Sequence, residues 1–270
     1  MRTLVHISDI HFGRIDYAVV EKLIVKINEI EPNLVVVSGD LTQRARSQQF
    51  IEARQFLDKL PKPQIVVPGN HDIPLYNVYS RFVSPLKKYK RFITNDLQPF
   101  YTDDEIAVLG INTARSLTVK GGRINQKQVA NIREKMCDLN DEILKVVVTH
   151  HPFDLPEGFA DDDLVGRAKM VMERIADCGA DLFLAGHMHI SHIGHTATRY
   201  KLDNHRSALV VQAGTAASTR GRGEANSFNL IEFEHPRLTV KRLEYQVGKG
   251  NFEQIENQIF QQTEKGWKPI

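Results

Sequence analysis

The stretch Pro68-Gly69-Asn70-His71-Asp72 decides the fold of this 270-residue chain. It follows a short, mostly apolar run, Gln-Ile-Val-Val, which is typical of a buried strand. Pro68 and Gly69 end the strand in a turn. Three polar side chains are therefore presented at the carboxyl end of the strand. An amide, an imidazole and a carboxylate on one tight turn suit a binding site better than a hydrophobic core.

Four further apolar runs, at residues 4–7, 34–37, 146–148 and 182–184, end in residues of the same kind. They are followed by these candidate ligands: Asp9 and His11, Asp40, His150, and His187 and His189. Between the early runs, apolar residues recur at helical spacing, which predicts βαβ units and a parallel sheet. Ligands bind outside the carboxyl ends of such strands. We therefore expect all five sets of residues to meet.

Imidazole and carboxylate ligands together suit Zn, Fe or Mn. With Asn70, the candidate ligands number seven. Seven are too many for one ion with open positions, but suit two ions that share a carboxylate. Two ions about 3.5–4 Å apart hold the attacking and leaving oxygens of a phosphoryl transfer and turn a bridging water into a hydroxide nucleophile near neutral pH. The alternative is that each polar residue only caps a strand or helix. That alternative would be preferred for Asp9 or Asp40 alone, but not for the whole set.

The motifs run in the order D-x-H, G-D, G-N-H-D, H and G-H-x-H from Asp9 to His189, about two thirds of the chain. This order resembles that of the calcineurin-like metallophosphoesterases, and most of all the bacterial class III cyclic-nucleotide phosphodiesterases. The resemblance implies an α/β fold, a four-layer αββα sandwich of two mixed β-sheets flanked by helices. It also implies a metal-dependent phosphoric ester hydrolase with two metal ions, Mn, Fe or Zn.

The same resemblance implies how the ligands divide between the metals. One metal would be held by Asp9, His11 and His189, the other by Asn70, His150 and His187, and Asp40 would bridge them. His71 would face the substrate rather than a metal. Because an alkoxide leaves poorly, we expect His71 to be the general acid, with Asp72 orienting its ring or favouring its protonated form. Asn112 ends another strand facing the crevice and is a candidate substrate-binding residue.

Several neighbouring residues have two interpretations. His151 is adjacent to His150 and could be the ligand instead, but the resemblance favours His150. Arg220 and Arg222 could contact a phosphate, although a mobile surface loop is the favoured interpretation. The basic run at 87–91 is interpreted as a solvated face rather than a track for nucleic acid.

Gln43 marks a departure from one branch of the superfamily. The Ser/Thr protein phosphatases read G-D-x-x-D-R-G, whereas here Gly39-Asp40 is followed by Leu-Thr-Gln-Arg-Ala, with Gln43 in place of the second Asp. This argues against a protein phosphatase and leaves the candidate metal ligands unaffected.

The leading prediction is therefore a phosphodiesterase for a small diester, with a 3',5'-cyclic nucleotide as the leading substrate. The first alternative is an exonuclease of the DNA-repair type, which needs a basic groove. The net charge of +2 argues against nucleic acid as a partner. The second alternative is a non-catalytic scaffold, which loss of a ligand would signal; none is missing. A homodimer is left open.

The length fits one large α/β domain or two small ones. The resemblance implies a metallophosphoesterase domain, which we place at residues 1–245, followed by a polar tail at 246–270 that we expect to be weakly held. No apolar run has the length of a membrane span, and the strand pattern begins at once, so we expect neither a membrane association nor a signal peptide. Cys137 and Cys178 are interpreted as buried free thiols, which favours the cytoplasm.

Overall fold

The computed structural model describes residues 1–118, 120–201, 207–220 and 223–270. Two β-sheets form the centre of the fold. In spatial order, the first contains β13 (Gly266–Pro269), β12 (Asn251–Thr263), β11 (Arg237–Gln246), β10 (Ser227–Glu234), β1 (Arg2–Ile7), β2 (Leu34–Val37) and β3 (Gln64–Val66). The second contains β4 (Phe100–Thr102), β5 (Ile106–Gly110), β6 (Leu144–Val148), β7 (Leu182–Ala185), β9 (Leu209–Gln212) and β8 (His192–His195).

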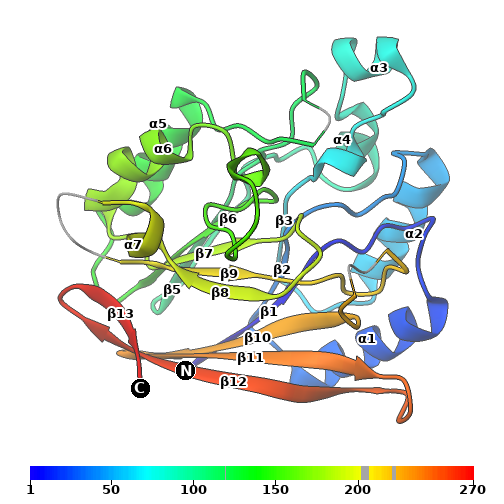
Figure 1. Ribbon diagram of the computed structural model, residues 1–270. Helices are drawn as coiled ribbons and strands as arrows, with labels where there is room; N and C mark the ends of the chain where they lie inside the picture. Colours follow the sequence, from blue (N-terminus) through cyan, green and yellow to red (C-terminus); the bar gives the residue numbers. More distant parts are fainter. Residues whose placement is uncertain (119, 202–206, 221–222) are drawn as a thin grey trace.

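The helices lie outside this pair of sheets. They are α1 (Tyr17–Ile30), α2 (Ser47–Asp58), α3 (Val78–Val83), α4 (Lys87–Phe92), α5 (Gln126–Met136), α6 (Ala168–Ile175) and α7 (Thr196–Arg199), with 3₁₀ turns at Asn70–Asp72, Asp161–Asp163 and Ala176–Cys178. Helices α1 and α2 lie beside the first sheet, and α5 and α6 beside the second (Figure 1).

Alternating side chains of the buried strands explain the layers. In β1, Leu4 joins the apolar cluster between the two sheets, whereas Val5 and Ile7 join the cluster beneath α1 and α2. Because successive side chains of a strand point to opposite faces, a strand buried on both faces is apolar throughout. In β6, Val146 packs between the sheets and Val147 packs against α5 and α6. The predicted four-layer αββα sandwich is confirmed.

Strand direction places the candidate ligands along one edge of each sheet. Strands β1, β2 and β3 are parallel, as are β5, β6, β7 and β9. Each parallel group therefore ends on the same side, and the segments that follow these ends carry the motifs. A hairpin joins β10 and β11, which pair from Glu234↔Arg237 onward.

The segment 246–270 is ordered into the sheet, so the prediction of a weakly held tail is wrong. Strand β12 pairs with β11 along nearly its whole length, and β13 pairs with β12. The segment is polar because β12 buries only Phe252 and Phe260 fully. Its anchor is Trp267, which is 2% exposed, packs near Phe233 and donates from its ring nitrogen to Asp181 at 3.1 Å.

We expect Trp267→Ala to lower the free energy of unfolding by about 3–5 kcal/mol, because it empties a site between the last strand and the sheet. Urea unfolding followed by circular dichroism measures the loss. Tryptophan fluorescence does not serve here, because Trp267 is the single tryptophan and the variant lacks it. Tyr17→Ala is the control, because Tyr17 is 65% exposed and its loss should change stability by about 0.5 kcal/mol or less. Similar small losses in both variants would contradict the anchoring role.

The two cysteines are paired in a disulfide, 41 residues apart in sequence. The prediction of free thiols is wrong, because the end of α5 and the turn after α6 bring Cys137 and Cys178 together. The argument for a reducing compartment therefore loses its basis. Within the described ranges, none of the helices has both the length and the apolar character that a membrane crossing requires.

Candidate metal centre

The candidate ligands lie in segments that are joined by backbone hydrogen bonds. The amide of Asp9 donates to the carbonyl of Gly39 at 3.1 Å, and the amide of His11 donates to the carbonyl of Asp40 at 3.0 Å. In the second sheet, the amide of Gly186 donates to the carbonyl of His150 at 3.1 Å. The ends of β1 and β2, and those of β6 and β7, are thereby fixed against each other.

Five of the seven candidate ligands adopt the left-handed backbone conformation. They are Asp9, His11, Asp40, His187 and His189, with φ between 51° and 73°. This conformation costs a non-glycine residue about 1–2 kcal/mol. Such strain persists where the surroundings enforce it, and it gathers at functional sites. Backbone strain at these positions therefore accompanies the direction of their side chains into the crevice.

Two motif glycines leave room for the carboxylates. A Cβ atom on Gly69 would collide with the carboxylate and amide of Asp40, and one on Gly186 would collide with Ser8 and the carboxylate of Asp9. The glycines of the G-N-H-D and G-H-x-H motifs are therefore required by close approach to the candidate ligands.

The first group of ligand atoms comes from Asp9, His11, Asp40 and His189, and these atoms lie within 4.8 Å of one another. The Nε2 atoms of His11 and His189 are 3.1 Å apart. Oδ1 of Asp9 lies 3.2 Å from Nε2 of His189 and 3.6 Å from Nε2 of His11. Two carboxylates and two imidazoles thus converge on one small volume.

Asp40 also reaches the second group. Its Oδ2 lies 3.7 Å from Nε2 of His11 and 3.4 Å from Nε2 of His150. Nε2 of His150 is in turn 3.1 Å from Oδ1 of Asn70. The ring centroids of His150 and His187 are 5.1 Å apart. One carboxylate oxygen is therefore shared between the two groups.

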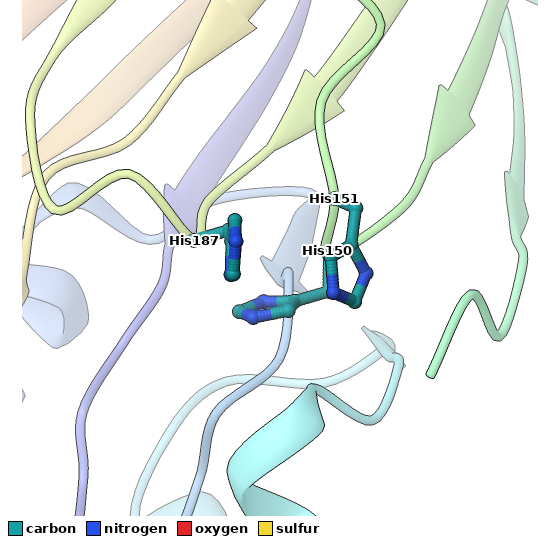
Figure 2. Close-up of side chains that lie close together, drawn as sticks. All are labelled: His150, His151 and His187. Atoms are coloured by element: carbon teal, nitrogen blue, oxygen red, sulfur yellow. The ribbon is translucent and has the colours of Figure 1, made fainter. Parts of the chain in front are cut away.

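The structure separates the roles of His150 and His151. Figure 2 shows both rings beside that of His187, and all three belong to one cluster of potential ligand atoms. However, Nδ1 of His151 is 2.8 Å from the hydroxyl of Thr113, and its Nε2 is 2.7 Å from the carbonyl of Lys120. Both nitrogens of His151 are thus occupied, whereas Nε2 of His150 faces Asp40 and Asn70.

The donor set fits metal ions. Nδ1 of His150 donates to the carbonyl of Ser38 at 2.8 Å, and Nδ1 of His189 donates to the carbonyl of Arg220 at 3.1 Å. These bonds leave the lone pair on Nε2, as in metal-binding histidines generally. Among the described residues, Oδ1 of Asp9 is buried without a hydrogen-bond partner. Nitrogen and oxygen donors of this kind suit Zn, Fe or Mn.

Charge interactions keep the carboxyl groups of the centre ionised, which favours cation binding. Burial opposes ionisation of Asp9 and Asp40, but the neighbouring imidazoles hold the pKa of both carboxyl groups below its usual range. Burial, together with the charge of His150, lowers the pKa of His187 to about 3. Burial also opposes the charge on His150, but Asp40 outweighs it and raises that pKa to about 9. A metal ion therefore competes with a proton at His150.

His71 lies at the rim of this centre. Its amide donates to Oδ1 of Asp40 at 2.8 Å, and its ring centroid is 4.9 Å from that of His11. Nδ1 of His71 is 3.0 Å from the carbonyl of Gln43, and Nε2 accepts from the guanidinium of Arg220 at 3.1 Å. Burial lowers the pKa of His71, and Asp40 acts in the opposite direction.

Asp72 does not orient the ring of His71, in contrast to the prediction. Its carboxylate is 1% exposed and accepts from the amides of Leu41, Thr42 and Gly69, and from the hydroxyl of Thr42. Burial and the charge of Asp40 raise the pKa of Asp72 to about 7, and these donors oppose that shift. Asp72 therefore ties the loop after β2 to the loop after β3.

Arg220 lies at the rim beside His71, whereas its sequence context favoured a mobile surface loop. Instead of pointing away in a surface loop, its guanidinium contacts His71 and, at 3.4 Å, Oε1 of Gln43. Its carbonyl also accepts from His189. No motif marks this position, and only its place after an apolar strand and a Gly-Thr turn hinted at it. Arg222 lies outside the described residues.

Asn112 lies beside the metal centre rather than in it. Its side-chain oxygen accepts from the amide of Ala114 at 2.9 Å, and the residue lines a pocket that also includes Ile73. The chain turns from Asn112 to Thr113, which holds His151.

A buried cluster of histidines and carboxylates at the strand ends of a four-layer αββα sandwich defines the class: a metal centre of the phosphoesterase kind. The family of calcineurin-like phosphoesterases matches residues 2–191, and the chain belongs to it.

Sequence identity to individual members is modest. A probable cyclic nucleotide phosphodiesterase of Ruthia magnifica subsp. Calyptogena magnifica is 29% identical over 134 residues, 43% of this chain and 56% of the relative. The glycerophosphodiester phosphodiesterase GpdQ of Enterobacter lignolyticus is 29% identical over 171 residues, 59% of this chain and 60% of the relative. The chain thus spans less than two thirds of the length of these curated relatives.

Among solved structures, the purple acid phosphatase PPD1 from yellow lupin (Lupinus luteus) seeds superimposes with a TM-score of 0.69. It is 11% identical in sequence, and the match covers 94% of this chain and 52% of that one. This likeness shows the fold alone.

Proposed function

We propose that this protein is a dinuclear metal-dependent phosphodiesterase acting on a small diester, with a 3',5'-cyclic nucleotide as the leading candidate. The observation that carries the proposal is the place of Asp40, whose Oδ2 lies 3.7 Å from His11 and 3.4 Å from His150. A single carboxylate oxygen between two sets of donors is the arrangement that two neighbouring metal ions require. The names of the relatives from Ruthia and Enterobacter support a diester substrate.

In this proposal Asp9, His11 and His189 hold one metal, Asn70, His150 and His187 hold the other, and Asp40 serves both. Bound metal ions would supply a nucleophile from water and neutralise charge on the phosphate. Ser8 and the amide of His187 hold the Asp9 carboxylate through bonds of 2.7 and 2.8 Å to Oδ2. Its Oδ1 is thereby directed at His11 and His189.

The residues at the rim would bind and orient the phosphate. The guanidinium of Arg220 donates to the ring of His71. A charge-assisted bond from a guanidinium to a phosphate is stronger than a bond from it to a neutral imidazole. When a phosphate draws Arg220 away, Nε2 of His71 becomes free to face the leaving oxygen. The carbonyl of Gln43 holds the ring of His71, and the carboxylate of Asp72 holds the neighbouring loop through the amide of Thr42.

We expect chelation to abolish hydrolysis of bis(p-nitrophenyl) phosphate, and Mn²⁺ or another first-row divalent ion to restore it, because all candidate ligands serve metal ions. The assay follows nitrophenolate release before EDTA treatment, after it and after metal addition. Undiminished hydrolysis by the metal-free protein would rule out the metal-dependent mechanism. If the metal-loaded protein hydrolyses no phosphoester either, the chain is a binding scaffold.

We expect diesters to be turned over faster than phosphoserine peptides at equal concentration. The protein phosphatases carry an Asp where this chain has Gln43, and here Gln43 contacts Arg220 and His71. Parallel assays of phosphate release from a phosphopeptide and of nitrophenolate release from a diester give the comparison. A higher kcat/KM for the phosphopeptide would overturn the assignment to diesters.

A further inference from the structure

A pocket of about 750 Å³ opens beside the metal centre. Its walls come from α4, from the segments before and after it, and from residues 112–116. Its apolar lining includes Ile73, Leu86 and Leu97. A volume of this size is in the range of sites for small organic ligands.

Two chain segments run from the lining of the pocket to the metal centre. Ile73 directly follows Asp72 and is two residues from His71, which lies at the rim of the centre. On the other wall, Asn112 precedes Thr113, whose hydroxyl contacts His151 beside the second group of ligands. Ile73 and Asn112 thus connect the lining of the pocket to two sides of the metal centre.

The basic run at 87–91 is not a uniform solvated face. Lys88 donates to the carbonyl of Ala45, and Tyr89 is fully buried, with its hydroxyl donating to the carbonyl of Val66. The remaining cations, Lys87, Lys90 and Arg91, follow the i, i+3, i+4 spacing that places side chains on one helix face. All three line the pocket.

Arg115 adds a fourth cation on the opposite wall. Its guanidinium is held by the carbonyls of Asn112 and Ala114 and by Oε1 of Gln128. In the part of the chain that the structure describes, no carboxylate pairs with it or with the three cations of α4, and the lining contains no Asp or Glu. Burial lowers the pKa of Arg115, which reflects the cost of this unneutralised charge.

We propose that this pocket binds a second anionic group of the substrate, a phosphate or carboxylate remote from the scissile phosphate. The inference rests on the proposed function and narrows its substrate class to diesters that carry a further negative charge, which an unmodified 3',5'-cyclic nucleotide lacks. Four cations without a counter-ion recognise the anion, and the apolar wall of Ile73, Leu86 and Leu97 receives the organic part between the two charged groups.

A matched pair of substrates tests the proposal. Thymidine 5'-(p-nitrophenyl phosphate) and its 3'-phosphorylated form differ only in the second anion. We expect the wild-type protein to show a kcat/KM about tenfold or more higher for the 3'-phosphorylated ester. In the triple variant Lys87→Gln, Lys90→Gln and Arg91→Gln, this preference should fall to about one, because exposed ion pairs each contribute modestly and add up.

The control variant removes three charges elsewhere: Lys22→Gln, Lys265→Gln and Lys268→Gln, exposed lysines on α1 and in the last hairpin. It should keep the wild-type preference. Glutamine preserves helix propensity on α4 and at Lys22, and circular dichroism confirms that both variants are folded. Equal kcat/KM for the two esters in the wild-type protein, or equal loss of preference in both variants, would overturn the proposal while leaving the phosphodiesterase assignment intact.

Failure of the proposed function gives a different result. If the metal-loaded protein hydrolyses neither ester, isothermal titration with thymidine 3',5'-bisphosphate and thymidine 5'-phosphate still tests the pocket. An affinity for the bisphosphate that drops about tenfold in the α4 variant alone, with the monophosphate unchanged, supports the anion site. Equal affinities of the wild-type protein and the α4 variant for the bisphosphate would overturn it.

Discussion

Replacing Asp40 with alanine is expected to remove both metal ions and to lower kcat/KM for a diester by about 10³-fold or more. The carboxylate contacts both ligand groups, through His11 and His150. Its loss therefore weakens two sites at once, and bound metals contribute several kcal/mol of charge stabilisation, each 1.36 kcal/mol being about tenfold in rate. Metal analysis of the purified variant by plasma mass spectrometry, together with the kinetic assay, measures both effects.

Two further variants make the Asp40 result specific. Asp40→Asn retains the shape and one neutral oxygen, so it should retain more metal than the alanine variant. Asp103→Ala removes a carboxylate that pairs with Arg2, at the opposite end of β1 from Asp9, and should keep both metals and full activity. Two metal ions per chain in Asp40→Ala would contradict the shared-ligand assignment.

Replacing His71 with alanine is expected to lower kcat by about 10²–10⁴-fold on a diester with an alkoxide leaving group. The loss should be much smaller on a p-nitrophenyl ester, whose leaving group needs no proton. We expect this difference because His71 contacts Asp40 through its backbone amide, which leaves the imidazole ring available to the leaving group. Steady-state kinetics on the two substrates, with metal content measured in parallel, separates leaving-group protonation from other roles.

The nitrophenyl ester is the internal control for this variant. Equal losses on both substrates with both metals retained would mean that His71 acts through the phosphate, for example by positioning Arg220, which donates to its ring. Loss of a metal from His71→Ala would instead make the residue a ligand, and the proposed division of the centre would be wrong.

Much of the fold and the composition of the site could be predicted because the information is local. Each candidate ligand directly follows an apolar run, and the end of a buried strand in a parallel sheet is a place whose position is known in advance. Asp9, Asp40, Asn70, His150 and His187 could be grouped for this reason, and the structure brings them together. Their roles as ligands remain a prediction that metal analysis must test.

What the sequence hid depends on contacts between distant residues. The bonds from Asp72 to Leu41 and Thr42 cross 31 and 30 residues, and those of Arg220 to Gln43 cross 177. Strand β12 escaped prediction for a different reason. It lies near the edge of the sheet and is polar on both faces, so it lacks the alternation that marks a half-buried strand.

The place of β1 has a consequence for how the chain is synthesised. Strand β1 lies between β2 and β10, and its residue His6 is 223 residues away from its neighbour Asn229. At about 5–20 residues per second, roughly 10–45 s separate the emergence of these two residues from the ribosome. During that interval one side of a hydrophobic strand has no partner and is open to pairing with other chains. The nascent protein thus carries an aggregation hazard at its amino terminus that only the completion of β10 removes, and chaperone binding there would shield it.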